Sequence, residues 1–172
     1  SKIPTIFKPI AKNCSRWTNS RISNVEKYYN RYKNSLANID AQLQKIMMVF
    51  DEKKIWQNTI VIITSDHGEE FDDNKQGYFG HSSNYTKYQL KVPMLVHWPQ
   101  KKTKNIFYKT THYDLVPTLI DDLLGCKIES SKYSIGKNIF NPKQTPFIIA
   151  GSYVNSAVIT DQNIFLLASN GA

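Results

Sequence analysis

The chain has 172 residues, and its content of 41% hydrophobic and 21% charged residues excludes a disordered polymer and predicts one folded domain with an apolar core. Its longest apolar runs are five residues, far below the roughly 20 that a membrane-spanning helix needs. The net charge is +8, and most of it lies in residues 1–33, where eight Lys and Arg residues accompany a single Glu.

Residues 1–30 are predicted to be an irregular basic segment. Its cationic residues are interleaved with aromatic ones, so it suits the phosphates of a nucleic acid or the anionic headgroups of a membrane surface, or it is an ordinary solvated surface. No recognised nucleic-acid-binding fold accompanies the charge, and we expect no nucleic acid partner. Cys14 and the distant Cys126 lack CxxC spacing, which argues against a zinc knuckle or a disulfide framework.

An amphipathic helix is predicted from about Val25 to Lys53, because apolar residues recur there at three- and four-residue steps. The run of β-branched residues in Thr59–Thr64 predicts a strand buried on both faces, as in the centre of a parallel sheet. A second short strand is predicted at Met94–Trp98, between two prolines. A helix followed by a buried strand indicates an α/β domain, which we assign to residues 31–145.

Residues 111–125 read THYDLVPTLIDDLLG and predict a further helix. Thr111 or Asp114 can cap its start, Pro117 fits only its first turn, and Gly125 occupies the place of a left-handed C-terminal residue. Residues 146–172 contain three short β-rich pieces separated by Asn and Asp turns. They predict a small antiparallel sheet appended to the α/β domain.

Asp66 and His67 directly follow the predicted buried strand. Ligands of open α/β sheets collect at the carboxyl ends of strands. A carboxylate oxygen beside an imidazole nitrogen suits a divalent cation such as Zn²⁺ or Mn²⁺, and Ca²⁺ less well, if Gly68 lets the backbone turn. His81, fourteen residues after His67, could be a further ligand or bind an anionic substrate oxygen. The alternative is a capping Asp and a hydrogen-bonded His without a metal.

The stretch Tyr32–Phe71, which ends in IVIITSDHGEEF, resembles the signature region of the sulfatase and alkaline phosphatase superfamily. Gly80–Pro99 and Thr111–Gly125 follow it in the order and spacing of that family. The motifs NYTKYQLKVP and YSIGKNIFNP are similar to the YejM (PbgA) branch, inner-membrane proteins with a sulfatase-like periplasmic domain. The resemblance implies a three-layer α/β/α core, of which this chain forms the C-terminal part.

The resemblance also implies roles for individual residues. Asp66 and His67 would bind a catalytic divalent metal ion, Zn²⁺, Mn²⁺ or Mg²⁺, and His81 would lie beside the substrate phosphate or sulfate. An Asp-His pair at this place is similar to the phosphoethanolamine transferase and lipoteichoic acid synthase branches, so phosphate is favoured over sulfate. The nucleophile and the remaining acidic ligands are expected upstream of Ser1, and the chain by itself is therefore expected to be inactive.

Two functions follow from the resemblance. The first, which we favour, is a sensor of lipopolysaccharide or another anionic lipid in the bacterial inner membrane. Its periplasmic domain would be anchored by transmembrane helices outside this chain and would regulate envelope lipid synthesis through protein partners. The alternative is a metal-dependent hydrolase, or a phosphoryl or phosphoethanolamine transferase, that acts on envelope lipids.

Overall fold

The computed structural model describes residues 5–10, 25–82, 84–141, 145–153 and 155–168. The chain divides into two compact units, Ser1–Lys102 and Thr103–Ala172. The boundary between them lies inside the segment that the sequence assigns to one α/β domain. Cys126 is an exposed free thiol, and Cys14 lies outside the described residues.

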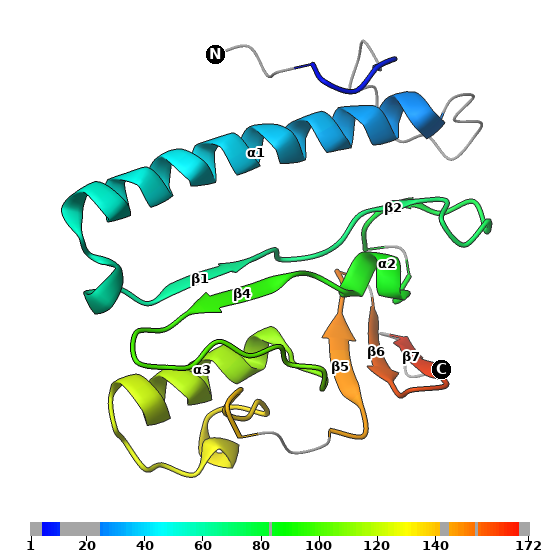
Figure 1. The fold of residues 1–172 in the computed structure, drawn as a ribbon. Coiled ribbons are helices and arrows are strands. Elements are labelled where there is room, and N and C mark those ends of the chain that lie inside the picture. The colour runs from blue at the N-terminus through cyan, green and yellow to red at the C-terminus, as the bar shows by residue number, and fades with distance from the viewer. Residues whose placement is uncertain (1–4, 11–24, 83, 142–144, 154, 169–172) are drawn as a thin grey trace. The chain divides into compact units, whose positions relative to one another are not determined.

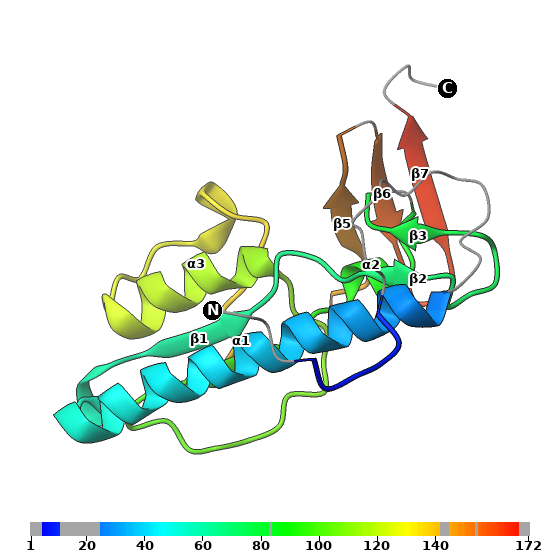
Figure 2. The same cartoon turned by 90° about the horizontal axis from the view of Figure 1, so that it is seen from above.

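The first unit is organised around the helix α1, Val25–Lys53, whose bounds match the predicted ones. It runs alongside the strand β1, Val61–Thr64, in both views of the ribbon (Figures 1 and 2). The apolar face of α1 is only partly covered, since Leu36 is 46% exposed and Ile39 is 52% exposed. None of the described helices combines the length and the apolar character that would let it cross a membrane.

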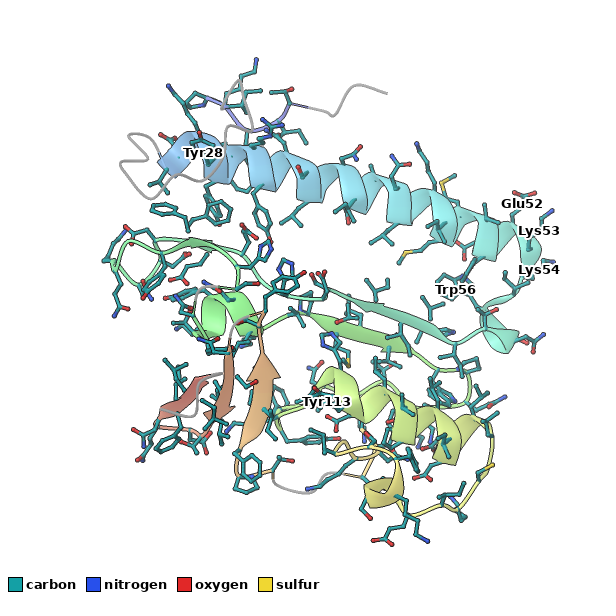
Figure 3. The ribbon with its side chains drawn as sticks, turned by 180° about the vertical axis from the view of Figure 1, so that it is seen from behind. Tyr28, Glu52, Lys53, Lys54, Trp56 and Tyr113 are labelled. Carbon is teal, nitrogen blue, oxygen red and sulfur yellow. The ribbon has the colours of Figure 1, made fainter. Side chains whose placement is uncertain are left out.

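Aromatic side chains at both ends of α1 pack against residues that follow the helix in the sequence. Near its start, the rings of Tyr29 and Tyr32 lie 5.3 and 5.2 Å from the ring of Phe71. Near its end, the ring of Phe50 lies 5.1 Å from that of Trp56, which follows the last turn of the helix (Figure 3). Aromatic pairs at such distances add to the stability gained from buried area, so these contacts hold the helix against the segments that follow it.

The strand β1 pairs antiparallel with β4, Met94–His97, so that Val61 lies opposite His97 and Thr64 opposite Met94. The expectation of a parallel strand buried on both faces is therefore wrong for this pairing, and the residues of β1 are half-buried or exposed. Continuous β-branched residues favour a strand with two covered faces, but they carry no information about the direction of the neighbouring strand.

A hairpin and a short helix lie between β1 and β4, where the sequence predicted no helix or strand. The strands β2, Glu70–Phe71, and β3, Phe79–Gly80, pair antiparallel, with Glu70 opposite Gly80. The helix α2, Lys87–Leu90, follows. Strands of two residues show no alternation and helices of four residues show no helical period, so neither element has a recognisable sequence pattern.

In the second unit, the predicted helix is present as a mixed helical segment. The carboxylate of Asp114 accepts a hydrogen bond from the backbone N–H of Thr111 at 2.6 Å, so both predicted cap residues take part. Gly125 has a φ of +67°, as a C-terminal left-handed residue should. The segment comprises a 3₁₀ turn at His112–Asp114, the helix α3 at Leu115–Thr118 and a π-helical turn at Leu119–Leu123.

The predicted appended sheet is also present, as three antiparallel strands in the order β5, β6, β7. The middle strand is β6, with both of its edges paired, and Ala157 at its centre is fully buried. The bounds of the strands are Ile148–Gly151 for β5, Asn155–Ile159 for β6 and Ile164–Ala168 for β7.

Replacement of Gly136 by Ala is expected to lower the free energy of unfolding by about 1–3 kcal/mol, the usual cost of overpacking. A Cβ atom at this position would lie 2.0 Å from the carbonyl oxygen of Tyr113, so the backbone would have to move. Gly151→Ala is the matched control, because its Cβ atom would be 3.7 Å from Ser156 Oγ. Urea denaturation measures both, and equal stabilities of the two variants would contradict the prediction.

Candidate metal centre

The end of β1 carries the first two site residues, Asp66 and His67. The hydroxyl of Ser65 donates to the carbonyl oxygen of His67 at 2.8 Å, and the backbone N–H of His67 donates to Asp66 Oδ1 at 3.0 Å. These short-range bonds bend the chain as it leaves the strand. As a result the side chains of Asp66 and His67 are both exposed to solvent and lie side by side, with Asp66 Oδ2 3.7 Å from His67 Nε2.

Gly68 lets the chain pass close to the backbone of α2, which is a reason for a glycine here that the sequence did not reveal. Its N–H donates to the carbonyl oxygen of Gln89 at 2.8 Å, and a Cβ atom would lie only 2.2 Å from the carbonyl oxygen of Tyr88. The backbone of Gly68 is not in the left-handed region. The glycine is therefore required by the close approach of α2 and not by the turn itself.

The β2–β3 hairpin then brings a carboxylate to a second histidine. Glu69 and His81 each lie one residue outside the paired residues Glu70 and Gly80, on opposite strands. His81 Nδ1 lies 3.0 Å from Glu69 Oε2. The rings of His81 and His67 stack with their centroids 3.9 Å apart, so the hairpin and the end of β1 meet at one place.

His67, Glu69 and His81 form a group whose ligand atoms all lie within 4.8 Å of one another. Two atoms that bind one ion at about 2.1 Å are at most about 4.2 Å apart. Small rotations of the side chains would therefore bring all three atoms to a single cation. Two imidazole nitrogens and a carboxylate oxygen suit Zn²⁺ or Mn²⁺ better than Ca²⁺, which prefers oxygen ligands alone.

The hydrogen bonds of His67 fit such a role. Its Nδ1 lies 2.8 Å from the carbonyl oxygen of Gly68, and since a carbonyl only accepts, Nδ1 carries the proton. In the neutral ring Nε2 is then left with a free lone pair beside Asp66, as in histidines that bind metals. The hydrogen bond from the backbone N–H of His67, and then the positive charge that its ring can carry, hold the pKa of Asp66 below its ordinary value.

The helix α1 also reaches the surroundings of the site. Burial raises the pKa of the Tyr32 hydroxyl, and the negative charge of Glu69 and the neighbouring Tyr29 raise it further. A tyrosine that stays neutral in this position adds no second negative charge beside Glu69.

The structure thus brings together His67 and His81, two of the three residues nominated from the sequence, and adds Glu69. Asp66, the third, lies beside His67 but is not a member of this group. Glu69 was not nominated as a ligand from the sequence. The signal that could have found it is its position relative to His81 across a short hairpin, which requires the register of β2 and β3. The roles themselves, metal binding by Asp66 and His67 and anion binding by His81, stay predictions.

Comparison with known proteins places the chain in a family. The sulfatase family model matches residues 2–125, and the chain belongs to the sulfatase family. This membership supports the expected α/β fold of the alkaline-phosphatase kind. The helices and small antiparallel sheets of this chain are consistent with a part of that fold. Sulfatases usually depend on a metal, which agrees with the presence of the His67, Glu69 and His81 group.

Individual relatives refine this assignment. The chain is 28% identical over 155 residues to the inner membrane protein YejM of Salmonella typhimurium, with 90% of this chain and 26% of that protein covered. YejM of Salmonella typhi matches with the same values. Arylsulfatase K of the dog, Canis lupus familiaris, is 29% identical over 117 residues, which are 67% of this chain and 21% of that protein. The chain therefore spans about a quarter of the length of the YejM proteins and is a YejM-like sulfatase-domain sequence.

Replacement of His67 by Ala is expected to weaken Zn²⁺ binding at least about tenfold, because it removes one of three converging donors. Isothermal titration calorimetry at neutral pH measures the change. His97→Ala is the matched control, since His97 Nε2 contacts the carbonyl oxygen of Trp56 at 2.9 Å and does not belong to the group. Equal losses in the two variants would show that zinc binds elsewhere.

Proposed function

We propose that this chain supplies the metal-binding part of a sulfatase-type domain that binds phosphorylated lipids of the bacterial envelope, lipopolysaccharide among them. The observation that carries the proposal is the convergence of His67, Glu69 and His81 on one point. A divalent cation bound there would offer its open coordination positions to the oxygens of a phosphate group.

The exposure of the group supports a large ligand. The side chains of Asp66, His67 and His81 are 86%, 41% and 47% exposed. A headgroup attached to a membrane can approach such a surface, whereas a closed cavity would admit only small molecules. His81 Nδ1 donates to Glu69, which orients the other ring nitrogen, Nε2, toward a cation or, in the protonated ring, toward an anionic oxygen.

The basic N-terminal region and the relatives support a membrane-associated role. Lys33 is among its described cationic residues, and its ammonium group lies 4.5 Å from the ring centre of Phe7 and 4.8 Å from that of Tyr29. Positive charge near an envelope surface attracts phosphorylated lipids. The YejM proteins are named as inner membrane proteins. We infer the same location for this protein, with this domain in the periplasm and with regulation of lipid synthesis through protein partners.

A second candidate function is hydrolysis or transfer of a phosphoryl or phosphoethanolamine group. The similarity to arylsulfatase K, a relative named as a sulfatase, supports an enzymatic role in general, and the Asp66-His67 pair favours phosphate over sulfate as the group acted on. The metal would polarise the ester and activate a hydroxyl nucleophile from another part of the protein. Among the residues of this chain, His67, Asp66 and Glu69 would hold the cation, and His81 would orient the anion.

Vesicles that contain lipid A are expected to bind the protein in the presence of Mn²⁺ or Zn²⁺ and to release it when EDTA is added. Binding should weaken as salt is raised, because phosphate contacts are screened. Asp66→Ala should reduce the binding and Asp161→Ala, a change in the second unit, should not. Cosedimentation with vesicles of phosphatidylcholine alone serves as the blank, and equal binding to both vesicle types would refute the proposal.

The catalytic alternative predicts turnover of bis(p-nitrophenyl) phosphate by the whole protein with added Mn²⁺ or Zn²⁺. Substitution of Asp66 or His67 by Ala should then lower the rate by at least about a hundredfold, since metal activation of the reacting groups would be lost. Release of nitrophenolate measures the rate. A protein that binds lipid A but stays inert in this assay performs the sensor function and not the enzymatic one.

A further inference from the structure

Glu70 is a fully buried carboxylate beside the candidate ligand Glu69. Its residue exposure is 0%, although it lies in a strand of only two residues. Adjacent residues of a strand point to opposite sides, so that Glu69 faces His81 while Glu70 turns into the interior. Its atom Oε2 accepts three hydrogen bonds, from Asn84 Nδ2 at 2.8 Å, Gln89 Nε2 at 2.8 Å and Thr86 Oγ1 at 3.3 Å.

Gln89 holds the chain on both sides of Glu69. Its side chain donates to Glu70, and its backbone carbonyl oxygen accepts the N–H of Gly68 at 2.8 Å. Gln89 is itself 3% exposed, and its Oε1 accepts the backbone N–H of Asn84 at 3.4 Å. One buried side chain and its own backbone therefore bind the residues immediately before and after a candidate metal ligand.

We propose that Gln89 and Glu70 are positioning residues of the metal centre, which set the place of Glu69 relative to His67 and His81. This inference rests on the proposed metal-binding function. Glu70 pairs with Gly80, the residue before His81, so the same clamp also fixes the start of the second histidine segment. Interactions one step away from the ligands commonly control metal affinity about 10–100-fold.

The hydrogen bonding of Glu70 indicates a specific task for the carboxylate. Its second oxygen, Oε1, is buried and has no hydrogen-bond partner among the described residues. The three donors to Oε2 are neutral side chains, which compensate a buried charge only in part. If this position served stability alone, an apolar side chain or a paired charge would be favoured. A carboxylate with no cationic partner in the described part of the chain is instead explained if its task is to hold the side chains of Asn84, Thr86 and Gln89 on one acceptor atom.

Four variants test the positioning role. Gln89→Met removes the amide at similar length and leaves the backbone bond to Gly68 in place. Glu70→Met removes the acceptor, whereas Glu70→Gln keeps one oxygen that can accept from all three donors. The matched control is Gln76→Met, a change in the exposed turn of the same hairpin. Zn²⁺ affinity is measured by calorimetry, and the ligand arrangement by the visible absorption of bound Co²⁺.

Gln89→Met and Glu70→Met are expected to lose about 10–100-fold in Zn²⁺ affinity and to change the Co²⁺ spectrum, while circular dichroism shows the fold retained. Glu70→Gln should restore most of the affinity, and Gln76→Met should match the unmodified protein. If Gln89→Met fails to fold, the comparison of Glu70→Met with Glu70→Gln decides. Equal affinities and spectra in all four variants would overturn the positioning role.

The controls separate this inference from the function on which it rests. If the unmodified protein binds Zn²⁺ and His67→Ala does not, the metal site stands, and wild-type behaviour of Gln89→Met and Glu70→Met then refutes the positioning role alone. If the unmodified protein binds neither Zn²⁺ nor Co²⁺, the metal site and the positioning role fail together.

Discussion

The contact between Gly68 and the backbone of Tyr88 and Gln89 is the constraint on which the site depends. The N–H of Gly68 donates to Gln89, and a Cβ atom would lie 2.2 Å from the carbonyl oxygen of Tyr88. A side chain at position 68 would separate the end of β1 from α2. Because Glu69 follows immediately and His81 begins the segment that leads to α2, the distance between these two residues depends on the same contact. The geometry of the metal centre thus depends first on the close approach of the Gly68 backbone to that of α2, and only then on the ligand side chains.

Polar contacts around this point replace part of the apolar packing. Glu70, Phe71 and Gln89 are all buried, while much of the apolar face of α1 remains exposed. Asn34 of α1 repeats the pattern, since its Oδ1 accepts the backbone N–H groups of Ile6 and Phe7 at 2.8 and 2.9 Å. Hydrogen bonds depend steeply on distance and angle, whereas the hydrophobic effect has no direction. A network of this kind restrains positions closely, which is what a centre with several converging ligands requires.

The sequence located the site but not its full membership. Asp66 and His67 were recognised because they follow a β-branched strand, and ligand residues gather at strand ends. Glu69 was not nominated as a ligand because its partner, His81, is brought to it by strands of two residues, too short to show a period. Gly68 was recognised with a different reason, since its φ is ordinary and only the neighbouring backbone makes a side chain impossible there. The residue types at the end of a strand can be recognised from the neighbouring sequence alone. Their partners lie in distant segments of the chain, so the sequence near the strand does not identify them.

By itself, the sequence determined the bounds of α1, the places of β1 and β4, the appended antiparallel sheet and the family. The structural features follow from apolar period, β-branched content and turn residues, which act over a few neighbouring positions, whereas the family was indicated by the resemblance of whole motifs. Only the tertiary structure decided that β1 and β4 run antiparallel, that Glu69 meets His81 and that Glu70 is buried under three donors. Strand direction, register and close backbone approach are set by the free energy of contacts between distant segments, and no local pattern records that free energy.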